Sequence, residues 1–191
     1  MKRNGFSLIE LIAVIGLMGI LAAVGTVSFR TWESKHQVEK QVKEMYADLN
    51  SIRIAAMHEN RSHFLTGGAS RVEAYRDTDP APDGNGALTV GSDTPVCMWT
   101  RGFRDAEDAN CPGGGLSYKN LTYGSSWSGG GNTIQFTARG LATLDSLGTI
   151  CVFSTVNPSY DCIKISRTRI IMGKIINQGG ACGEANCQEK R

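Results

Sequence analysis

A carboxylate at the front of an apolar run is the first group in this chain that could do chemistry. Glu10 precedes Leu11–Phe29, a stretch of nineteen residues without a charged side chain. As a helix this stretch would be about 28 Å long at ~1.5 Å per residue, close to the ~30 Å hydrocarbon core of a bilayer. A carboxylate in such a segment costs about 2.5–3.5 kcal/mol at the bilayer centre and less near the interface. Glu10 therefore needs a partner or a function.

Six cysteines form the second group, and all lie in the C-terminal half of the chain. Strands predicted at Gly148–Phe153 and Asp161–Ser166, with a turn at Asn157–Ser159, place Cys151 directly opposite Cys162 in an antiparallel hairpin. Facing positions in such a ladder lie about 4.5–5.5 Å apart, within the reach of a disulfide. Because six cysteines allow fifteen connectivities, other pairings stay open. The pairs that we predict are Cys151–Cys162, Cys182–Cys187 by proximity and Cys97–Cys111 by elimination.

The histidines and the acidic loop give no sign of catalysis or of a metal site. His36, His58 and His63 fall on or just after a predicted helix, where we expect surface or boundary positions. No CxxC pair accompanies them, so a structural zinc site is not expected. The acidic segment Asp77–Asp83 does not have the spacing of an EF-hand. Since no carboxylate–histidine–nucleophile grouping is recognisable, we expect no enzyme, no cofactor and no bound metal.

The residues in front of the apolar run set its direction. Lys2 and Arg3 keep this end in the cytoplasm by the positive-inside rule, so the C-terminal domain is exported. A cleaved secretory signal that ends at Ala22–Gly25 and a plain membrane anchor are the two alternatives. Neither alternative explains Glu10.

The run Gly5-Phe6-Ser7-Leu8-Ile9-Glu10-Leu11, followed by an apolar helix, resembles the class III signal of type IV prepilins and type II secretion pseudopilins. The resemblance implies that a prepilin peptidase removes residues 1–5 as the leader, cleaving after Gly5, and N-methylates Phe6. It also implies that Glu10 pairs with the amino group of Phe6, in its own chain or a neighbour, during filament assembly. Such a pair is strongly attractive in low dielectric, where a lone charge is penalised. The implied partners are other pilin or pseudopilin subunits, prepilin peptidase, the inner-membrane assembly platform and inner-membrane lipid.

One long helix is expected from about residue 6 to about residue 60. Residues 6–30 form its transmembrane or filament-core part, and residues 31–60 form an amphipathic part that packs on the head. No proline interrupts the apolar part, in contrast to many type IV pilins, and its glycines are the local weak points. In the second part, apolar residues recur at steps of three and four, the period of a helix with one buried stripe. The stripe is Val38, Val42, Met45, Leu49, Ile52 and Ala56.

Residues 61–191 are expected to form an exported, β-rich domain, which makes the fold α+β with a small antiparallel sheet packed on the long helix. Turn-forming residues cluster at Asp79–Gly86, Cys111–Gly115 and Gly129–Asn132. A turn is predicted at Arg139-Gly140. In addition to the C-terminal hairpin described above, four further short strands are predicted. Their ranges are Ala87–Val90, Val96–Thr100, Leu116–Tyr123 and Thr133–Phe136.

The order of these C-terminal elements resembles the GspH/FimT family of minor pilins and pseudopilins. Arg167 and Arg169 stand where some DNA-uptake members carry Gly-Arg-x-Arg, with Ser166 in place of the glycine, and Lys164 and Lys174 are close in sequence. Two residues apart, the arginines would share one face of a strand and could contact phosphates. We favour a solvated face, or a polar contact with a neighbouring subunit, over DNA.

Charge and composition agree with this interpretation. The net charge is +2, and loss of Lys2 and Arg3 with the leader leaves 20 − 2 = 18 basic against 18 acidic residues. This balance gives no overall basic signature for nucleic acid. An even number of cysteines in an exported chain favours disulfides.

The leading hypothesis is a structural minor pilin of a type IV pilus that acts at the tip or in the initiation of assembly. It would be a single-pass inner-membrane protein with a cytoplasmic N-terminus and a periplasmic C-terminal domain, and later a part of the filament or cell surface. The alternatives are an H-type minor pseudopilin of a type II secretion system and a DNA-binding minor pilin for DNA uptake.

Overall fold

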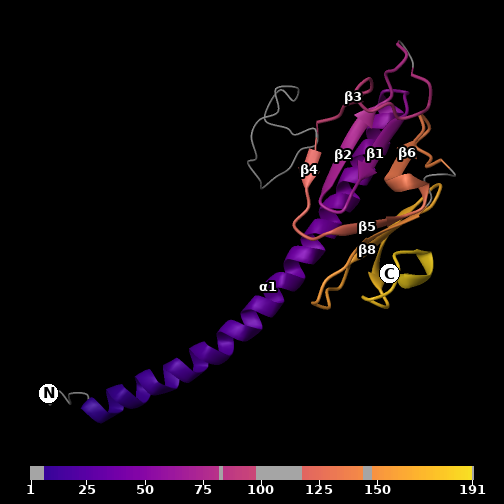
Figure 1. The fold of residues 1–191 in the computed structure, drawn as a ribbon. Helices are drawn as coiled ribbons and strands as arrows, with labels where there is room; N and C mark the ends of the chain where they lie inside the picture. The colour runs from indigo at the N-terminus through magenta and orange to yellow at the C-terminus, as the bar shows by residue number, and fades with distance from the viewer. Residues whose placement is uncertain (1–6, 82–83, 98–117, 144–147, 191) are drawn as a thin grey trace.

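The protein consists of one long helix and a head of β-strands. The computed structural model describes residues 7–81, 84–97, 118–143 and 148–190 of the 191-residue chain. The helix, α1 (Leu8–His58), comes first and every described strand follows it. Figure 1 shows α1 as a curved rod, with the sheets packed along its C-terminal half and its own N-terminal end far from the head. The predicted α+β class is confirmed.

Helix α1 passes through the apolar part of the chain without a break. Ser7 stands at its N-cap in an extended conformation, and no side chain caps the first turn. Gly16 and Gly19 both stay helical. At the other end the N–H of Glu59 donates to the Ala55 carbonyl at 2.8 Å, and Asn60 adopts a left-handed φ of 50° that turns the chain toward the strands. The long helix predicted from residue 6 to residue 60 is therefore confirmed over Leu8–His58.

The first sheet has the strand order β3-β2-β1-β6, and β4 pairs with β2 beside β3. Its centre is a hairpin in which Leu65 lies opposite Ala74. Prediction located β6 and placed β4 within the longer range Leu116–Tyr123, but it missed the hairpin. Strand β1 buries three consecutive residues instead of alternating, whereas β2 does alternate, with Val72 and Ala74 buried. The bounds are β1 (His63–Gly67), β2 (Arg71–Arg76), β3 (Thr94–Pro95), β4 (Tyr118–Asn120) and β6 (Thr133–Phe136).

Two of the predicted strands are wrong within the described residues. Residues 87–90 form no strand, because the buried Asp93 carboxylate holds this segment as a loop by accepting the N–H of Thr89 at 2.7 Å. Residues 96 and 97 also form no strand, although the Val96 N–H still donates to the Ala74 carbonyl of β2 at 2.8 Å. The remainder of that predicted strand, residues 98–100, lies outside the described residues.

The second sheet has the order β10-β9-β8-β7-β5. Strands β7 and β8 match the two predicted strands of the C-terminal hairpin, and Cys151 lies opposite Cys162 as the predicted register requires. Short 3-10 turns at Gly130–Asn132 and Glu184–Asn186 precede β6 and β10. The bounds are β5 (Ser125–Ser128), β7 (Gly148–Val152), β8 (Cys162–Ile165), β9 (Ile170–Ile175) and β10 (Cys187–Glu189).

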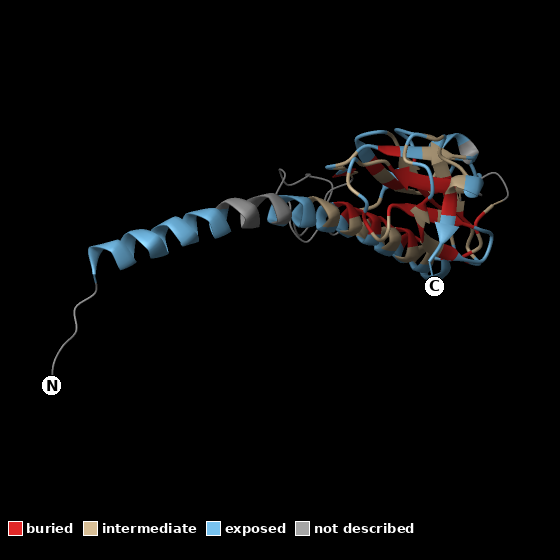
Figure 2. Ribbon diagram, turned by 90° about the horizontal axis from the view of Figure 1, so that it is seen from below, coloured by how far each residue is buried: buried red, intermediate tan, exposed pale blue. Residues whose placement is uncertain are grey.

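The apolar stripe of α1 forms one core with both sheets. All six stripe residues are at most 3% exposed, as predicted. They share a cluster with Leu65 and Ile134 of the first sheet and with Ile150 and Ile163 of the second. In Figure 2 the buried colour runs along the C-terminal half of the helix and into the head.

Polar contacts at the edges of this core fix the helix against the head. The Lys119 ammonium on β4 lies 3.1 Å from Glu44 and 3.0 Å from Asp48, so a nearly buried cation has two carboxylate partners. Burial raises the pKa of Asp48, and the opposing charge of Lys119 limits the rise. The Gln41 amide donates to the Tyr123 carbonyl and accepts the Tyr123 N–H. These contacts therefore fix the position of α1 relative to the head.

Two disulfides join the C-terminal segment to the second sheet, and they correct the predicted pairs Cys151–Cys162 and Cys182–Cys187. The observed bonds are Cys151–Cys182 and Cys162–Cys187. Cys162 and Cys187 stand on β8 and β10, on either side of β9, and their bond passes over Gly173. A Cβ at Gly173 would lie 3.1 Å from one sulfur and 2.9 Å from the other. The third predicted pair, Cys97–Cys111, includes a cysteine outside the described residues.

Candidate functional site

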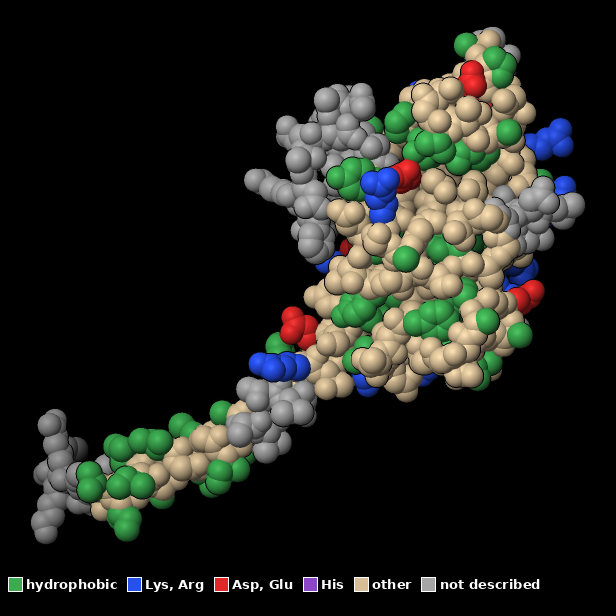
Figure 3. All heavy atoms as spheres, viewed as in Figure 1, with side chains coloured by type: hydrophobic (Ala, Val, Ile, Leu, Met, Phe, Trp, Pro, Cys, Tyr) green, Lys and Arg blue, Asp and Glu red, His purple; other side chains and the backbone are tan. Residues whose placement is uncertain are grey.

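The N-terminal half of α1 exposes apolar side chains on every side. Leu8 is 78% exposed and Leu21 is 65% exposed, and among the described residues of α1 the first buried one is Val38. In Figure 3 hydrophobic side chains stand out along both edges of the coloured part of this protruding segment. A continuous apolar surface much larger than a few hundred Å² marks an interface with a membrane or with protein. The segment Leu8–Phe29, here called the apolar half, is therefore the candidate site.

Glu10 lies in the first turn of this apolar half. Its side chain is exposed, and it forms no salt bridge or hydrogen bond with other side chains of the described residues. The N–H groups of Glu10 and Leu11 both point back to the Ser7 carbonyl. A carboxylate at this position interacts favourably with the positive end of the helix dipole. The structure thus presents one carboxylate at the free end of an apolar rod. Gly5 and Phe6, the predicted cleavage and methylation residues, lie outside the described residues.

Residues 1–26 match the family described as "Prokaryotic N-terminal methylation motif". The match covers the leader, Glu10 and most of the apolar half. It supports a precursor of a type IV pilin or pseudopilin that prepilin peptidase processes, with assembly among pilin-like subunits. No curated protein and no solved structure matches the chain. In the part of the chain that the structure describes, no helix has both the length and the apolarity required to span a membrane.

The four basic residues predicted as a possible DNA strip do not form one strand face. Strand β8 ends at Ile165 and β9 begins at Ile170, so Arg167 and Arg169 lie in the turn between them. The Ser166 side chain closes that turn by hydrogen bonds with the backbone of Arg169. The expectation that the two arginines alternate along a strand is therefore wrong, because a side-chain-stabilised turn interrupts the run.

The two lysines are separated by the sheet itself. Lys164 lies opposite Ile171, so alternation along β9 puts Lys174 on the other face of the sheet. Lys164 is also already paired, at 2.7 Å from Glu184 and 3.8 Å from Glu189. These positions leave Arg167 and Arg169 as the exposed basic pair at this end of the head.

A groove of about 680 Å³ lies beside this turn. Arg139 and Arg167 line it, together with Thr137 and Thr143. The left-handed Gly140, with φ 69°, turns the chain here, and a Cβ at this position would lie 2.6 Å from the Met57 sulfur. The predicted Arg139-Gly140 turn is confirmed, and it brings a second arginine near Arg167 that the sequence did not indicate.

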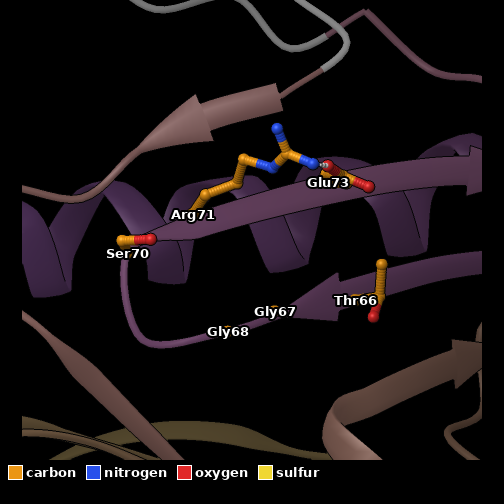
Figure 4. A pocket seen from close by; sticks show the side chains of 6 residues that line it. All are labelled: Thr66, Gly67, Gly68, Ser70, Arg71 and Glu73. Carbon is orange, nitrogen blue, oxygen red and sulfur yellow. Dashed lines mark ion pairs between the residues drawn. The ribbon is translucent and has the colours of Figure 1, made fainter.

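A smaller hollow of about 250 Å³ lies at the β1–β2 turn. Figure 4 shows its lining, with Arg71 directed along β2 toward Glu73 and with Gly67 and Gly68 contributing backbone. Arg71 forms a salt bridge with Glu73, which also accepts the Tyr75 hydroxyl at 2.7 Å. Burial, reinforced by Glu73, raises the pKa of Tyr75 to about 12. The charged groups of this hollow are thus engaged with one another rather than directed at a ligand.

His63 differs from the surface or boundary position that we expected. Its side chain is fully buried at the start of β1, with Nδ1 3.2 Å from the Arg61 carbonyl and Nε2 3.6 Å from Glu59. Burial lowers its pKa. The tertiary packing of the missed β1–β2 hairpin is responsible, and no sequence pattern around His63 signals it.

The acidic loop is organised by backbone hydrogen bonds. The buried Asp77 carboxylate accepts the N–H groups of Asn85 and Gly86, at 3.1 Å and 2.7 Å. Within the described residues no group of three metal-ligating side chains comes together, and Asp83 lies outside them. The Asp77 carboxylate therefore shapes this loop.

One further feature escaped sequence analysis. Phe29, the last residue of the apolar half, forms a chain of ring contacts along α1 with Trp32 and His36. Their spacing of three and four residues places them on one helix face. The sequence shows that spacing, but Phe29 was counted with the apolar run and so was not grouped with Trp32 and His36.

Proposed function

We propose that this protein is a structural minor pilin of a type IV pilus. In this proposal prepilin peptidase cleaves after Gly5 and methylates Phe6, and residues 6–30 hold the subunit in the inner membrane with the head on the periplasmic side. The subunit then enters the filament at its tip or during initiation. The observation that carries the proposal is the methylation motif at residues 1–26, which overlaps a helix whose apolar side chains from Leu8 to Leu21 are exposed.

The physical basis of assembly is the transfer of the apolar half from lipid into a bundle of helices. Its side chains already avoid water in the membrane, so packing and polar pairing rather than the hydrophobic effect would select the register. Glu10 supplies that selection, because its carboxylate is stable in the bundle when it is paired with the amino group of Phe6.

Substitution of Glu10 by Ala tests the assembly role. We expect normal membrane insertion and processing, but strongly reduced recovery of the subunit in sheared filaments. Glu33→Ala is the matched control, since Glu33 is an exposed acid on the same helix beyond the apolar half. Equal recovery of the Glu10 variant and the control in filaments would contradict the role.

The processing step has its own measurement. Mass spectrometry of the mature protein should find an N-methylated Phe6 at the N-terminus. An intact Met1, or cleavage near Gly25, would contradict processing as a prepilin.

An H-type pseudopilin of a type II secretion system shares the same processing and topology. Deletion of the gene distinguishes the two systems. It should abolish pili if the protein is a minor pilin, and secretion of exoproteins if it is a pseudopilin.

DNA uptake is a second candidate because Arg139 and Arg167 line one groove at an exposed end of the head. Binding through these arginines would weaken steeply with salt, as phosphate contacts release counterions. A gel shift of the full chain in detergent, compared with Arg139→Ala/Arg167→Ala, tests it. The absence of any shift at low salt would dismiss this candidate.

A further inference from the structure

The aromatic ladder, defined as Phe29, Trp32 and His36, is exposed although its rings are ordered against one another. The ring centroids of Phe29 and Trp32 are 6.0 Å apart, and those of Trp32 and His36 are 5.6 Å apart with planes parallel within 2°. Phe29 and Trp32 are each 61% exposed. At ~100° per residue the ladder lies on the side of α1 away from Val38 and Val42, so the head leaves it uncovered.

Unpaired positive charge accompanies the ladder. Arg30 and Lys35 flank it, and neither belongs to a salt bridge among the described residues. Glu33 is the only acidic residue between Phe29 and His36. Both cations have long apolar stems, which allow a charged head to reach a polar layer while the stem stays on an apolar surface.

The position of the ladder along the helix matches a membrane–water interface. It begins where the apolar half ends and finishes two residues before the first buried contact of the head, at Val38. Seven residues of helix rise about 10 Å, comparable to the ~5–8 Å headgroup layer on each side of a bilayer. Aromatic rings with a polar edge collect in that layer, and basic side chains there meet lipid phosphates.

We propose that the aromatic ladder, with Arg30 and Lys35, binds the phospholipid headgroup layer on the exported side and fixes the depth of insertion of α1. This inference rests on the proposed membrane insertion and adds the contact that sets its depth. The ladder then holds the head clear of the lipid, because Val38 begins the packed part of the helix just above the interface. The experiment below distinguishes this lipid contact from the alternative, in which the helix of a second subunit covers the ladder.

Fluorescence quenching by brominated lipid measures the contact directly. Full-length protein is reconstituted in vesicles of phosphatidylcholine and phosphatidylglycerol that carry bromine either near the carbonyls or near the chain ends. Wild type is compared with Trp32→Phe, so that the difference reports Trp32. The control is Trp32→Phe/Ile54→Trp, since Ile54 is also 61% exposed but lies 22 residues, about 33 Å, farther along α1.

We expect bromines near the carbonyls to quench wild-type tryptophan emission more than bromines near the chain ends. This quenching should disappear in Trp32→Phe, and it should stay absent in the Trp32→Phe/Ile54→Trp control. Vesicle flotation is measured in parallel. Protein that floats with Trp32 unquenched overturns the ladder but not membrane insertion. A blue-shifted yet unquenched Trp32 identifies a protein partner as the occupant and also overturns it. Protein that does not float overturns both proposals.

Discussion

The two halves of α1 carry similar apolar side chains in different surroundings. Leu17 in the apolar half is 64% exposed, whereas Leu49 in the second half is fully buried against the sheets. The difference lies in the pattern around them: the second half confines its apolar residues to one stripe, and the first half has them on all sides. A single stripe is satisfied by one head, whereas a helix that is apolar all round needs a membrane or several neighbouring helices. One helix therefore serves two kinds of packing.

Truncation of one leucine in each half should show this contrast most strongly. Leu49→Ala removes buried methyl groups and leaves a cavity, so we expect the free energy of unfolding of the head to fall by about 4 kcal/mol. Leu17→Ala should change it by less than about 0.5 kcal/mol, because its side chain contributes no packing to the head. Denaturant unfolding of the full chain in detergent micelles measures both. Equal effects would mean that the two halves are not independent.

Loss of one disulfide should destabilise only the head. Cys162→Ala/Cys187→Ala opens a loop with a sequence separation of 25 residues, for which we expect about 3 kcal/mol. The helicity of the apolar half should not change in circular dichroism. Gly173→Ala is the companion variant, since its Cβ would crowd both sulfurs and the Gln188 carbonyl. Peptide mapping that recovered a Cys151–Cys162 bond from wild type would contradict the observed pairing.

Acid should weaken the junction between helix and head by a smaller amount. Burial lowers the pKa of His63, so the unfolded chain, with a pKa near ~6.5, binds this proton more readily than the folded one. The contribution of neutral His63 is complete above that value and is lost as pH falls through the folded pKa. We expect stability to fall between pH ~7 and ~5. The hydrogen bond with the Arg61 carbonyl and the charge of Glu59 reduce this loss, whereas the charges of Arg76 and Arg61 add to it.

His63→Asn measures this effect against His58→Asn, an exposed histidine of the last helical turn. Unfolding of both variants is followed across the same pH range. The His63 variant should show a flatter dependence on pH than wild type, and the His58 variant should follow wild type. A His63 variant with the wild-type slope would locate the acid sensitivity elsewhere.

Local periodicity made the helix predictable. The stripe from Val38 to Ala56 was read from steps of three and four residues, and every member is buried. The β6 strand and the register of Cys151 against Cys162 were equally local, because a short hairpin leaves few alternatives. Glu10 was also identified from its neighbours alone. Each of these inferences depends on residues close together in the chain.

Packing between distant segments decided the rest. The sequence determined that Cys151 and Cys162 face each other, but the tertiary structure bonded them to Cys182 and Cys187, because β9 and β10 carry the C-terminal cysteines across Gly173. Burial of His63 likewise depends on a hairpin packed over the end of the helix. The sequence by itself determined an apolar rod with one carboxylate and a buried stripe behind it. Only the tertiary structure decided which strands pack on that stripe, and that the packed contacts begin at Val38 and so leave the aromatic ladder open.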